Sequence, residues 1–385
     1  MFNSLDIQNY RNLKKLTISS LGQINLITGK NNTGKSTLLE AVAIYATKGG
    51  IIDELLNERG EYFDQNELRR RSMRENQTKD DVFEKNIKAL SSLFTNRLIG
   101  FKEVDAILIG CIDNTLFGEQ QSYLNSISLR FRKYIYEISN GEEEMINTKR
   151  VFLDDNSDQR FENAKMGFEV KIGNETYTLS QLDGDRLYRF RFKSSSNNFN
   201  IQFIKAGNIN AKTNGNLFDN IALTEKENYV IDALKIIEPS TERIAFTGDD
   251  FSNDRKAIIK LSTSKDVLPL QSMGDGINRI LTIILALVNS DNGFLLIDEF
   301  ENGLHYTVQE KLWRIIFELS QKLNVQVFAT THSSDCINGF EATLNSTDSS
   351  LGKLIRLEND NNDIKYVDFD ASELKTANER NIEIR

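Results

Sequence analysis

Residue types typical of extracellular, metal-bound or membrane proteins are scarce in this sequence. Its 385 residues contain two cysteines, Cys111 and Cys336, too few for a disulfide framework and not spaced as zinc ligands. The longest apolar runs, such as residues 280–288, are far shorter than the roughly 20 residues of a membrane span. Residues 1–11 lack the basic and then apolar segments of a secretion signal. We therefore expect a cytoplasmic location and no membrane partner.

Acidic residues outnumber basic residues, 56 to 47. With a net charge of −9, the protein is not expected to bind nucleic acid over its whole surface, although a local basic patch is still compatible with DNA binding. The densest basic segment, residues 68–74, has acidic neighbours and a helical pattern, so it fits a solvated helix face or part of a DNA groove. DNA is therefore a possible partner that the overall charge does not indicate.

The order of the predicted elements indicates an α/β fold. Alternating apolar residues predict three strands within residues 2–29, followed by a helix over residues 37–48. Segments within residues 120–205 also alternate between apolar and polar residues, which predicts further strands. After Pro269 we expect a helix (277–289), a strand (294–298), a helix (306–322), a strand (325–329) and a hairpin near 353–368. Strands that alternate with helices of this length predict a parallel sheet covered by helices.

A phosphate-binding loop is the clearest motif in the chain. The segment GKNNTGKST, residues 29–37, fits G-x-x-x-x-G-K-[ST] and lies between a predicted strand and a predicted helix. Gly29 and Gly34 allow the backbone N–H groups to turn toward phosphate oxygens, assisted by the positive end of the helix dipole. Lys35 would pair with the β- and γ-phosphates, and Ser36 would offer a hydroxyl to Mg²⁺. We expect an ATP site.

The segment FLLIDEFENGLH, residues 294–305, supplies an acidic partner for that loop. Its four leading apolar residues predict a buried strand, and Asp298 follows at the carboxyl end, where ligands bind in open α/β sheets. We expect Asp298 to hold the Mg²⁺ hydration shell and Glu299 to act as the general base that polarises the attacking water. Acidic residues at strand ends are common, so this assignment depends on the phosphate loop.

Two further segments could complete the site. His332 ends the strand-like segment VQVFATTHS and could hydrogen-bond the γ-phosphate, or could simply cap the next element; His305, the second of two histidines, could begin a helix. Residues 270–281 hold Ser272, Gly274 and Gly276 at the start of an amphipathic helix. They fit either an ordinary helix N-terminus or a helix end that senses the phosphate of another subunit.

In this order the motifs resemble the ABC-type ATPase heads of the OLD/RecF-like branch, which is also related to SMC proteins. The resemblance is carried by residues 8–16, 24–41, 272–279, 295–305 and 329–333, and it extends to residues 216–239 and to a closing hairpin ending at residues 381–385. Tyr10 stands where the family usually has phenylalanine. The implied fold is a mixed sheet around the phosphate-loop core, an antiparallel β lobe and a largely helical insertion.

The resemblance implies a head-to-head dimer with two ATP molecules between the subunits. Ser272, Gly274 and Gly276 would act on the partner's nucleotide, His332 would be a switch histidine, and residues 301–305 would cross the interface. With Lys35 and Glu299, His332 completes the catalytic set. The remaining nucleotide contacts implied are Arg11, Gly29, Asn31, Asn32, Thr33, Gly34, Lys35, Ser36 and Thr37, with Ser36 and Asp298 as Mg²⁺ ligands.

We divide the chain into residues 1–48 (first part of the ATPase core), 49–119 (helical insertion), 120–215 (β-rich lobe) and 216–385 (second part of the core). The 53 residues after His332 are expected to form a hairpin and a short helix, with no nuclease domain in the chain. The chain in this respect resembles stand-alone ATPase subunits of bacterial anti-phage systems such as PARIS.

The resemblance predicts a slowly hydrolysing sensor or scaffold that forms a homodimer or higher homo-oligomer through its ATP-bound heads. We expect it to control a separate effector, a Toprim-like nuclease. The alternative is a RecF- or SMC-like DNA-repair clamp, whose basic surface would include residues 68–74 and the Arg/Lys-rich residues 186–193. Three features argue against a transporter subunit: the long insertion, the divergent form of the ABC signature at residues 272–279, and the start at residues 8–16, where the family shows N-F-R.

Overall fold

In the computed structural model, a six-stranded mixed sheet carries the phosphate loop. Its strand order is β16–β15–β3–β14–β13–β9, and every neighbouring pair is parallel except the β15–β16 hairpin. The strands are β3 (Ile24–Gly29), β9 (Ile201–Ile204), β13 (Phe294–Ile297), β14 (Gln326–Thr330), β15 (Gly352–Asp360) and β16 (Asp363–Phe369). The central strands β3, β13 and β14 are buried along their whole length, as their nearly continuous apolar sequences predict for a sheet covered on both faces.

Successive side chains of this sheet enter two different hydrophobic cores. Phe294 and Leu296 of β13 face a core shared with the first helix, whereas Leu295 and Ile297 face the core of the later helices. This alternation follows from the two-residue period of a strand. The phosphate loop at the end of β3 is therefore fixed between two packed layers.

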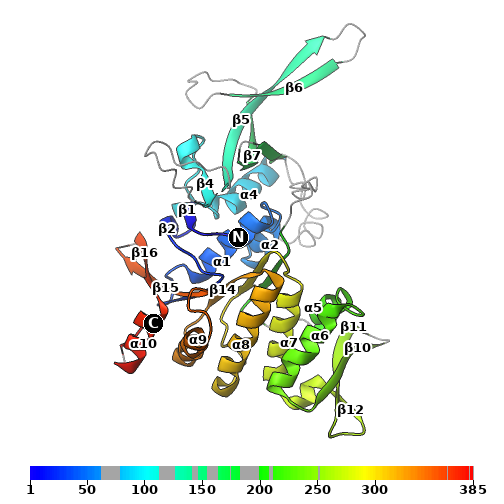
Figure 1. Ribbon diagram of the computed structural model, residues 1–385. Helices are drawn as coiled ribbons and strands as arrows, with labels where there is room; N and C mark the ends of the chain where they lie inside the picture. Colours follow the sequence, from blue (N-terminus) through cyan, green and yellow to red (C-terminus); the bar gives the residue numbers. More distant parts are fainter. Residues whose placement is uncertain are drawn as a thin grey trace.

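An antiparallel sheet lies over the first core and forms the upper part of the molecule (Figure 1). Its order is β2–β1–β4–β5–β7–β8, with β6 paired to β5, and the β5–β6 hairpin projects from the body. The strands are β1 (Leu5–Tyr10), β2 (Leu13–Ile18), β4 (Ile107–Gly110), β5 (Ser126–Asn140), β6 (Ile146–Phe152), β7 (Lys165–Ile172) and β8 (Glu175–Gln181). The helices α1 (Lys35–Ala46), α2 (Ile52–Glu58) and α4 (Lys79–Ser91) belong to this half.

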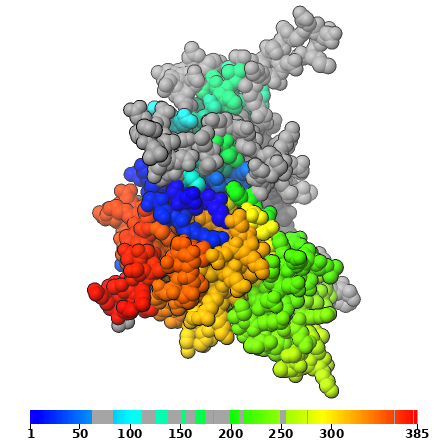
Figure 2. Space-filling model, in the orientation of Figure 1, coloured from blue at the N-terminus to red at the C-terminus, as the bar shows by residue number. Residues whose placement is uncertain are grey.

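The later helices cover the opposite face of the six-stranded sheet. They are α5 (Ala211–Asp219), α6 (Glu225–Ile237), α7 (Asp275–Val288), α8 (Tyr306–Leu323), α9 (Ser334–Ser346) and α10 (Ala371–Glu379). A small antiparallel sheet of β10 (Thr241–Asp249), β11 (Ser252–Leu261) and β12 (Val267–Pro269) packs beside α5 and α6. In the space-filling view this green and yellow region and the red C-terminal residues lie on opposite sides of the lower half (Figure 2). Short 3₁₀ turns span Thr95–Arg97, Glu103–Asp105 and Leu270–Met273.

The predicted α/β fold with a mixed sheet and an antiparallel lobe is confirmed, and most element boundaries agree within two residues. The prediction for the residues after His332 is wrong in one respect, because α9 precedes the hairpin. Its start could have been recognised, since Ser333 caps the helix by accepting the amide of Cys336. The closing hairpin also ends at Phe369, and residues 382–384 follow α10 without strand structure.

The structure describes residues 1–61, 79–111, 126–140, 146–153, 164–173, 175–182, 199–207, 211–249, 252–361, 363–380 and 382–384. The basic segments at 68–74 and 186–193 lie outside them. The four-segment division of the chain stays a prediction. Within the range 49–119, the described residues contain the helices α2 and α4 and also the strand β4, which pairs with β1 of the N-terminal segment.

Candidate functional site: a phosphate-binding loop with an acidic partner

The loop between β3 and α1 has the backbone that its glycines predict. Gly29 has φ 139° and Gly34 has φ 91°, conformations that residues with a Cβ rarely adopt. A Cβ on Gly29 would also lie 2.4 Å from the carbonyl oxygen of Leu357. The helix α1 begins at Lys35, directly after Gly34, so its free N–H groups open toward the loop.

Lys35 extends into this loop rather than into solvent. Its Nζ donates to the carbonyl oxygens of Gly29 and Lys30, both at 2.8 Å, and the residue is 7% exposed. Burial lowers the pKa of Lys35, while the nearby carboxylates of Asp298, Glu301 and Glu299 oppose that shift. The ammonium group is thus held at the loop and is available to exchange a carbonyl for a phosphate oxygen.

Ser36 and Asp298, the two residues predicted to bind Mg²⁺, meet across the sheet edge. The Ser36 hydroxyl donates to Oδ1 of Asp298 at 3.1 Å, and Thr330 donates to the same oxygen at 2.6 Å. The described residues contain no group of three His, Cys, Asp or Glu side chains that could hold a metal by themselves. One hydroxyl and one carboxylate fit Mg²⁺, which keeps several waters and binds phosphate oxygens as well. Ser36 and Asp298 would hold that ion.

Glu299 directly follows Asp298 in an uncommon backbone conformation, with φ 49°. Its amide donates to Thr330 Oγ1 at 2.9 Å. Arg279 of α7 donates to the carbonyl oxygens of Asp298 and Glu299 at 3.0 and 3.2 Å, and it is 3% exposed. Burial lowers the pKa of Arg279, and the carboxylates of Asp298, Glu299 and Glu301 oppose that shift. Thr330 and Arg279 had no predicted role, and together they fix the backbone at the predicted base.

A cavity of about 420 Å³ lies over the phosphate loop and collects most of the predicted nucleotide contacts. Its lining includes Arg11, Asn31, Asn32, Gly34, Lys35, Ser36, Thr37 and His332. The side chain of Thr33 instead donates to the Lys30 carbonyl oxygen at 2.9 Å and braces the loop itself. Asp298 is connected to this group of residues by its hydrogen bond with Ser36. The predicted cluster therefore forms in the folded chain.

Asn12 and Arg59, neither of which had a predicted role, also line this cavity. Arg59 follows α2 and bonds to Glu40 of α1 through Nε at 3.1 Å and through its terminal nitrogen. Arg11 forms an ion pair with the same carboxylate at 3.4 Å. Asn12 adjoins Arg11 and could have been found from that motif, whereas no local signal marks Arg59. Glu40 thus orients two cations at the mouth of the cavity.

His332 and His305 have different surroundings. His332 lines the cavity, and its backbone amide donates to Oε1 of Glu301 at 2.7 Å. His305 is the N-cap of α8, where Nδ1 accepts the amide of Thr307. The interpretation that His305 begins a helix is confirmed, and the role of His332 at the γ-phosphate stays a prediction.

Ser272, Gly274 and Gly276 are not among the residues that line this cavity. Ser272 is exposed and donates to the Pro269 carbonyl oxygen at 2.7 Å, and Gly274 is exposed with φ 100°. Gly276 lies where α7 approaches the loop after β13, because an added Cβ would be 3.2 Å from the Gly303 carbonyl oxygen. Two of the three are therefore free to face another subunit, and the third allows close packing within the chain.

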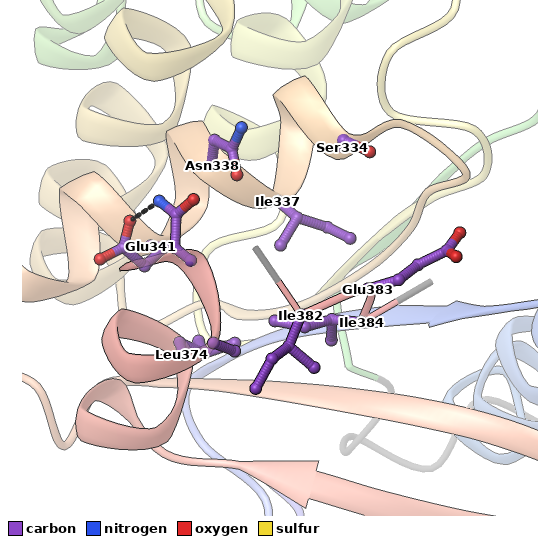
Figure 3. Close-up of a pocket in the computed structure, with 10 residues that line it drawn as sticks. Ser334, Ile337, Asn338, Glu341, Leu374, Ile382, Glu383 and Ile384 are labelled. Carbon is purple, nitrogen blue, oxygen red and sulfur yellow. Dashed lines mark hydrogen bonds between the residues drawn. The ribbon is translucent and has the colours of Figure 1, made fainter. Parts of the chain in front are cut away.

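A second cavity, of about 340 Å³, lies between α9, α10 and residues 382–384. Ile337, Leu374 and Ile384 contribute apolar surface, and Glu341 accepts a hydrogen bond from Asn378 at 3.0 Å (Figure 3). None of the predicted nucleotide contacts lines it. The chemistry expected from the sequence therefore concentrates at the phosphate loop.

Together, the loop, the cavity over it and the Ser36–Asp298 pair define a P-loop nucleotide-binding domain of the α/β class. A family model, the AAA ATPase domain (AAA_15), matches residues 1–337, and the chain belongs to this family. This membership confirms the ATPase class expected from the motifs. The OLD/RecF-like branch and the role in defence remain proposals.

Individual relatives are more distant. The chain is 24% identical over 368 residues to a protein of Helicobacter pylori described as an ATP/GTP phosphatase, and the match covers 90% of each. It is 42% identical over 69 residues to the uncharacterized protein MJECL10 of Methanocaldococcus jannaschii, covering 16% of this chain and 32% of that protein.

Similar solved structures include two SMC heads. One, bound to the C-terminal winged-helix domain of ScpA, has a TM-score of 0.49 and 14% identity, covering 97% of this chain and 99% of that one. The SMC head of Thermotoga maritima has a TM-score of 0.42 and 10% identity, covering 96% and 100%.

Proposed function

We propose that this protein binds ATP with Mg²⁺ and hydrolyses it slowly between two copies of the chain, and that the nucleotide state controls a separate effector protein. The observation that carries the ATPase part is the meeting of Ser36 with Asp298 at the phosphate loop, next to Glu299. Family membership and the similarity to an ATP/GTP phosphatase support it. Under this proposal Glu299 polarises the attacking water, and Lys35 and His332 stabilise the charge that develops on the γ-phosphate.

The dimer part is supported by the exposure of Ser272 and Gly274. Both lie beside the start of α7, outside the cavity that the same chain forms over its phosphate loop. A second copy would bring this helix end to the γ-phosphate and would complete the pocket.

Among the described residues no helix is long and apolar enough to span a membrane.

The proposed effector is a nuclease of the Toprim type, and the proposed role is anti-phage defence. Both proposals rest on the motif resemblance rather than on a contact in this structure. The described residues offer no feature that favours the alternative of a DNA-repair clamp, because both basic segments invoked for it lie outside them. Salt-sensitive DNA binding that ATP strengthens would favour the clamp instead.

Glu299→Gln tests the ATPase part. The amide cannot accept the water proton, so we expect phosphate release to fall at least about 100-fold, within the range for loss of a general base. Light scattering after gel filtration should then show an ATP-dependent dimer that outlasts the wild-type one. Glu318→Gln, at an exposed position on α8, is the matched control. A Glu299→Gln protein that hydrolyses ATP at the wild-type rate would refute the assignment.

Co-purification tests the effector part. A nuclease encoded beside this gene should elute with the wild-type protein and lose the association when Lys35→Ala abolishes ATP binding. Separate elution of the two proteins under both conditions would rule out the sensor role while leaving the ATPase part intact.

A further inference from the structure

The carboxylate of Glu301 makes contacts that the reaction outlined above does not use. Oε1 accepts the backbone amide of His332 and Oε2 accepts the hydroxyl of Thr331, both at 2.7 Å. Thr331 is fully buried, whereas His332 is exposed at the cavity. A single carboxylate thus fixes the two residues that directly follow β14.

Glu301 is itself held firmly by its own loop. The preceding residue, Phe300, is fully buried and stacks on Trp313 of α8 with ring centroids 4.1 Å apart. The Leu304 amide donates to the Glu301 carbonyl oxygen at 2.9 Å and closes a turn. The backbone that carries this carboxylate is therefore anchored in the core.

The same loop also contacts two other parts of the site. The side chain of Asn302 donates to the Ala206 carbonyl oxygen, and Gly303 lies against the start of α7 at Gly276. A displacement of the α7 start would therefore act on this loop. Glu301 connects the loop to His332, because its carboxylate accepts the His332 amide.

We propose that Glu301 is a positioning residue for His332, and that it ties the orientation of His332 to the loop of residues 301–305. Glu301 does not line the phosphate-loop cavity, whereas His332 does, so Glu301 acts through His332. The kinetic part of this inference rests on the proposed ATPase function. In the proposed dimer α7 of each copy begins beside this loop, so docking of the second copy would set the His332 position through Glu301.

Removal of the carboxylate should lower catalysis without weakening ATP binding. For Glu301→Ala we expect kcat to fall about tenfold and KM for ATP to stay within about twofold, since hydrogen-bonded support of a catalytic group contributes on this scale. Glu301→Gln should be intermediate, because its Oε1 can still accept the His332 amide. Glu310→Ala, at an exposed ion pair with Arg314, is the control and should have no effect.

A double-mutant comparison separates positioning from general structural support. In a His332→Ala background, Glu301→Ala should cost little further, because its effect passes through the missing imidazole. An equal fall in rate in both backgrounds would overturn the proposal.

A spectroscopic readout decides the same question without ATPase activity. The chain has two histidines, so ¹⁵N-histidine labelling gives two backbone amide signals, and His305→Asn, which retains a capping side chain, assigns them. Glu301→Ala should move the His332 amide proton upfield and leave the His305 signal in place. An unchanged His332 signal would refute the proposal, and a wild-type protein without ATPase activity would refute the proposed function alone.

Discussion

The hydroxyl of Thr330 joins the predicted metal ligand to the predicted base. Its Oγ1 donates to the Asp298 carboxylate at 2.6 Å and accepts the Glu299 amide at 2.9 Å. Thr330 ends β14, which pairs in parallel with β13, so the two strand ends meet at one edge of the sheet. The hydroxyl therefore orients both acidic residues from the neighbouring strand.

Thr330→Val should weaken catalysis and Mg²⁺ use. Valine keeps the shape of threonine but cannot donate to Asp298, and the loss of such an outer hydrogen bond typically costs about 10- to 100-fold in activity or metal affinity. Phosphate release measured over a Mg²⁺ series should show a lower maximum and a higher half-saturating concentration. Thr330→Ser keeps the hydroxyl and should stay near wild type; a serine variant as impaired as the valine variant would argue for packing instead.

Arg279 should contribute to stability as well as to the site. Arg279→Met leaves the carbonyl oxygens of Asp298, Glu299 and Lys205 without their charged donor. We expect the free energy of unfolding in urea to fall by about 2–3 kcal/mol, the scale of hydrogen bonds to a charged group. Arg314→Met removes an exposed arginine from α8 and should change it by less than about 0.5 kcal/mol. Equal, small effects of both substitutions would contradict this role.

Glu40 should control nucleotide affinity through Arg11 and Arg59. Glu40→Ala removes the carboxylate that both guanidinium groups share, and the Tyr10 hydroxyl also loses its acceptor. We expect Kd for ATP, measured by titration calorimetry, to rise about tenfold, equivalent to about 1.4 kcal/mol. Arg59→Ala should reproduce part of this loss. Unaltered affinity in both variants would mean that these cations do not contact the nucleotide.

Mixing two inactive variants tests whether the site is shared between copies. Lys35→Ala disables the phosphate loop, and Ser272→Arg should block the helix start that faces the partner. A mixed dimer has one intact site, so an equal mixture should regain about a quarter of the wild-type rate if dimers form at random. Each variant alone should remain inactive. A mixture without recovered activity would indicate that Ser272 does not serve the partner's nucleotide.

Motifs that depend on short stretches of chain could be recognised without coordinates. The glycine spacing in residues 29–37 specifies left-handed backbone that few other residues adopt, and continuous apolar runs mark strands buried on both faces. Asp298 followed from its place at the end of such a strand. The helix α9 was not among the predicted elements, although Ser333 carries a capping signal.

The α/β class could be predicted without coordinates because it follows from the order of strands and helices along the chain. The phosphate loop and the acidic residues at the end of β13 could be predicted because each depends on residues within one turn or one strand of each other. Three contacts exist only because the chain folds: Arg59 donates to Glu40, Arg279 donates to the Glu299 carbonyl oxygen, and Glu301 accepts the His332 amide. These pairs join separate elements, and their partners are chosen by strand order and helix packing. Spacing along the chain does not encode that choice, since many side chains of the same type could serve at each end.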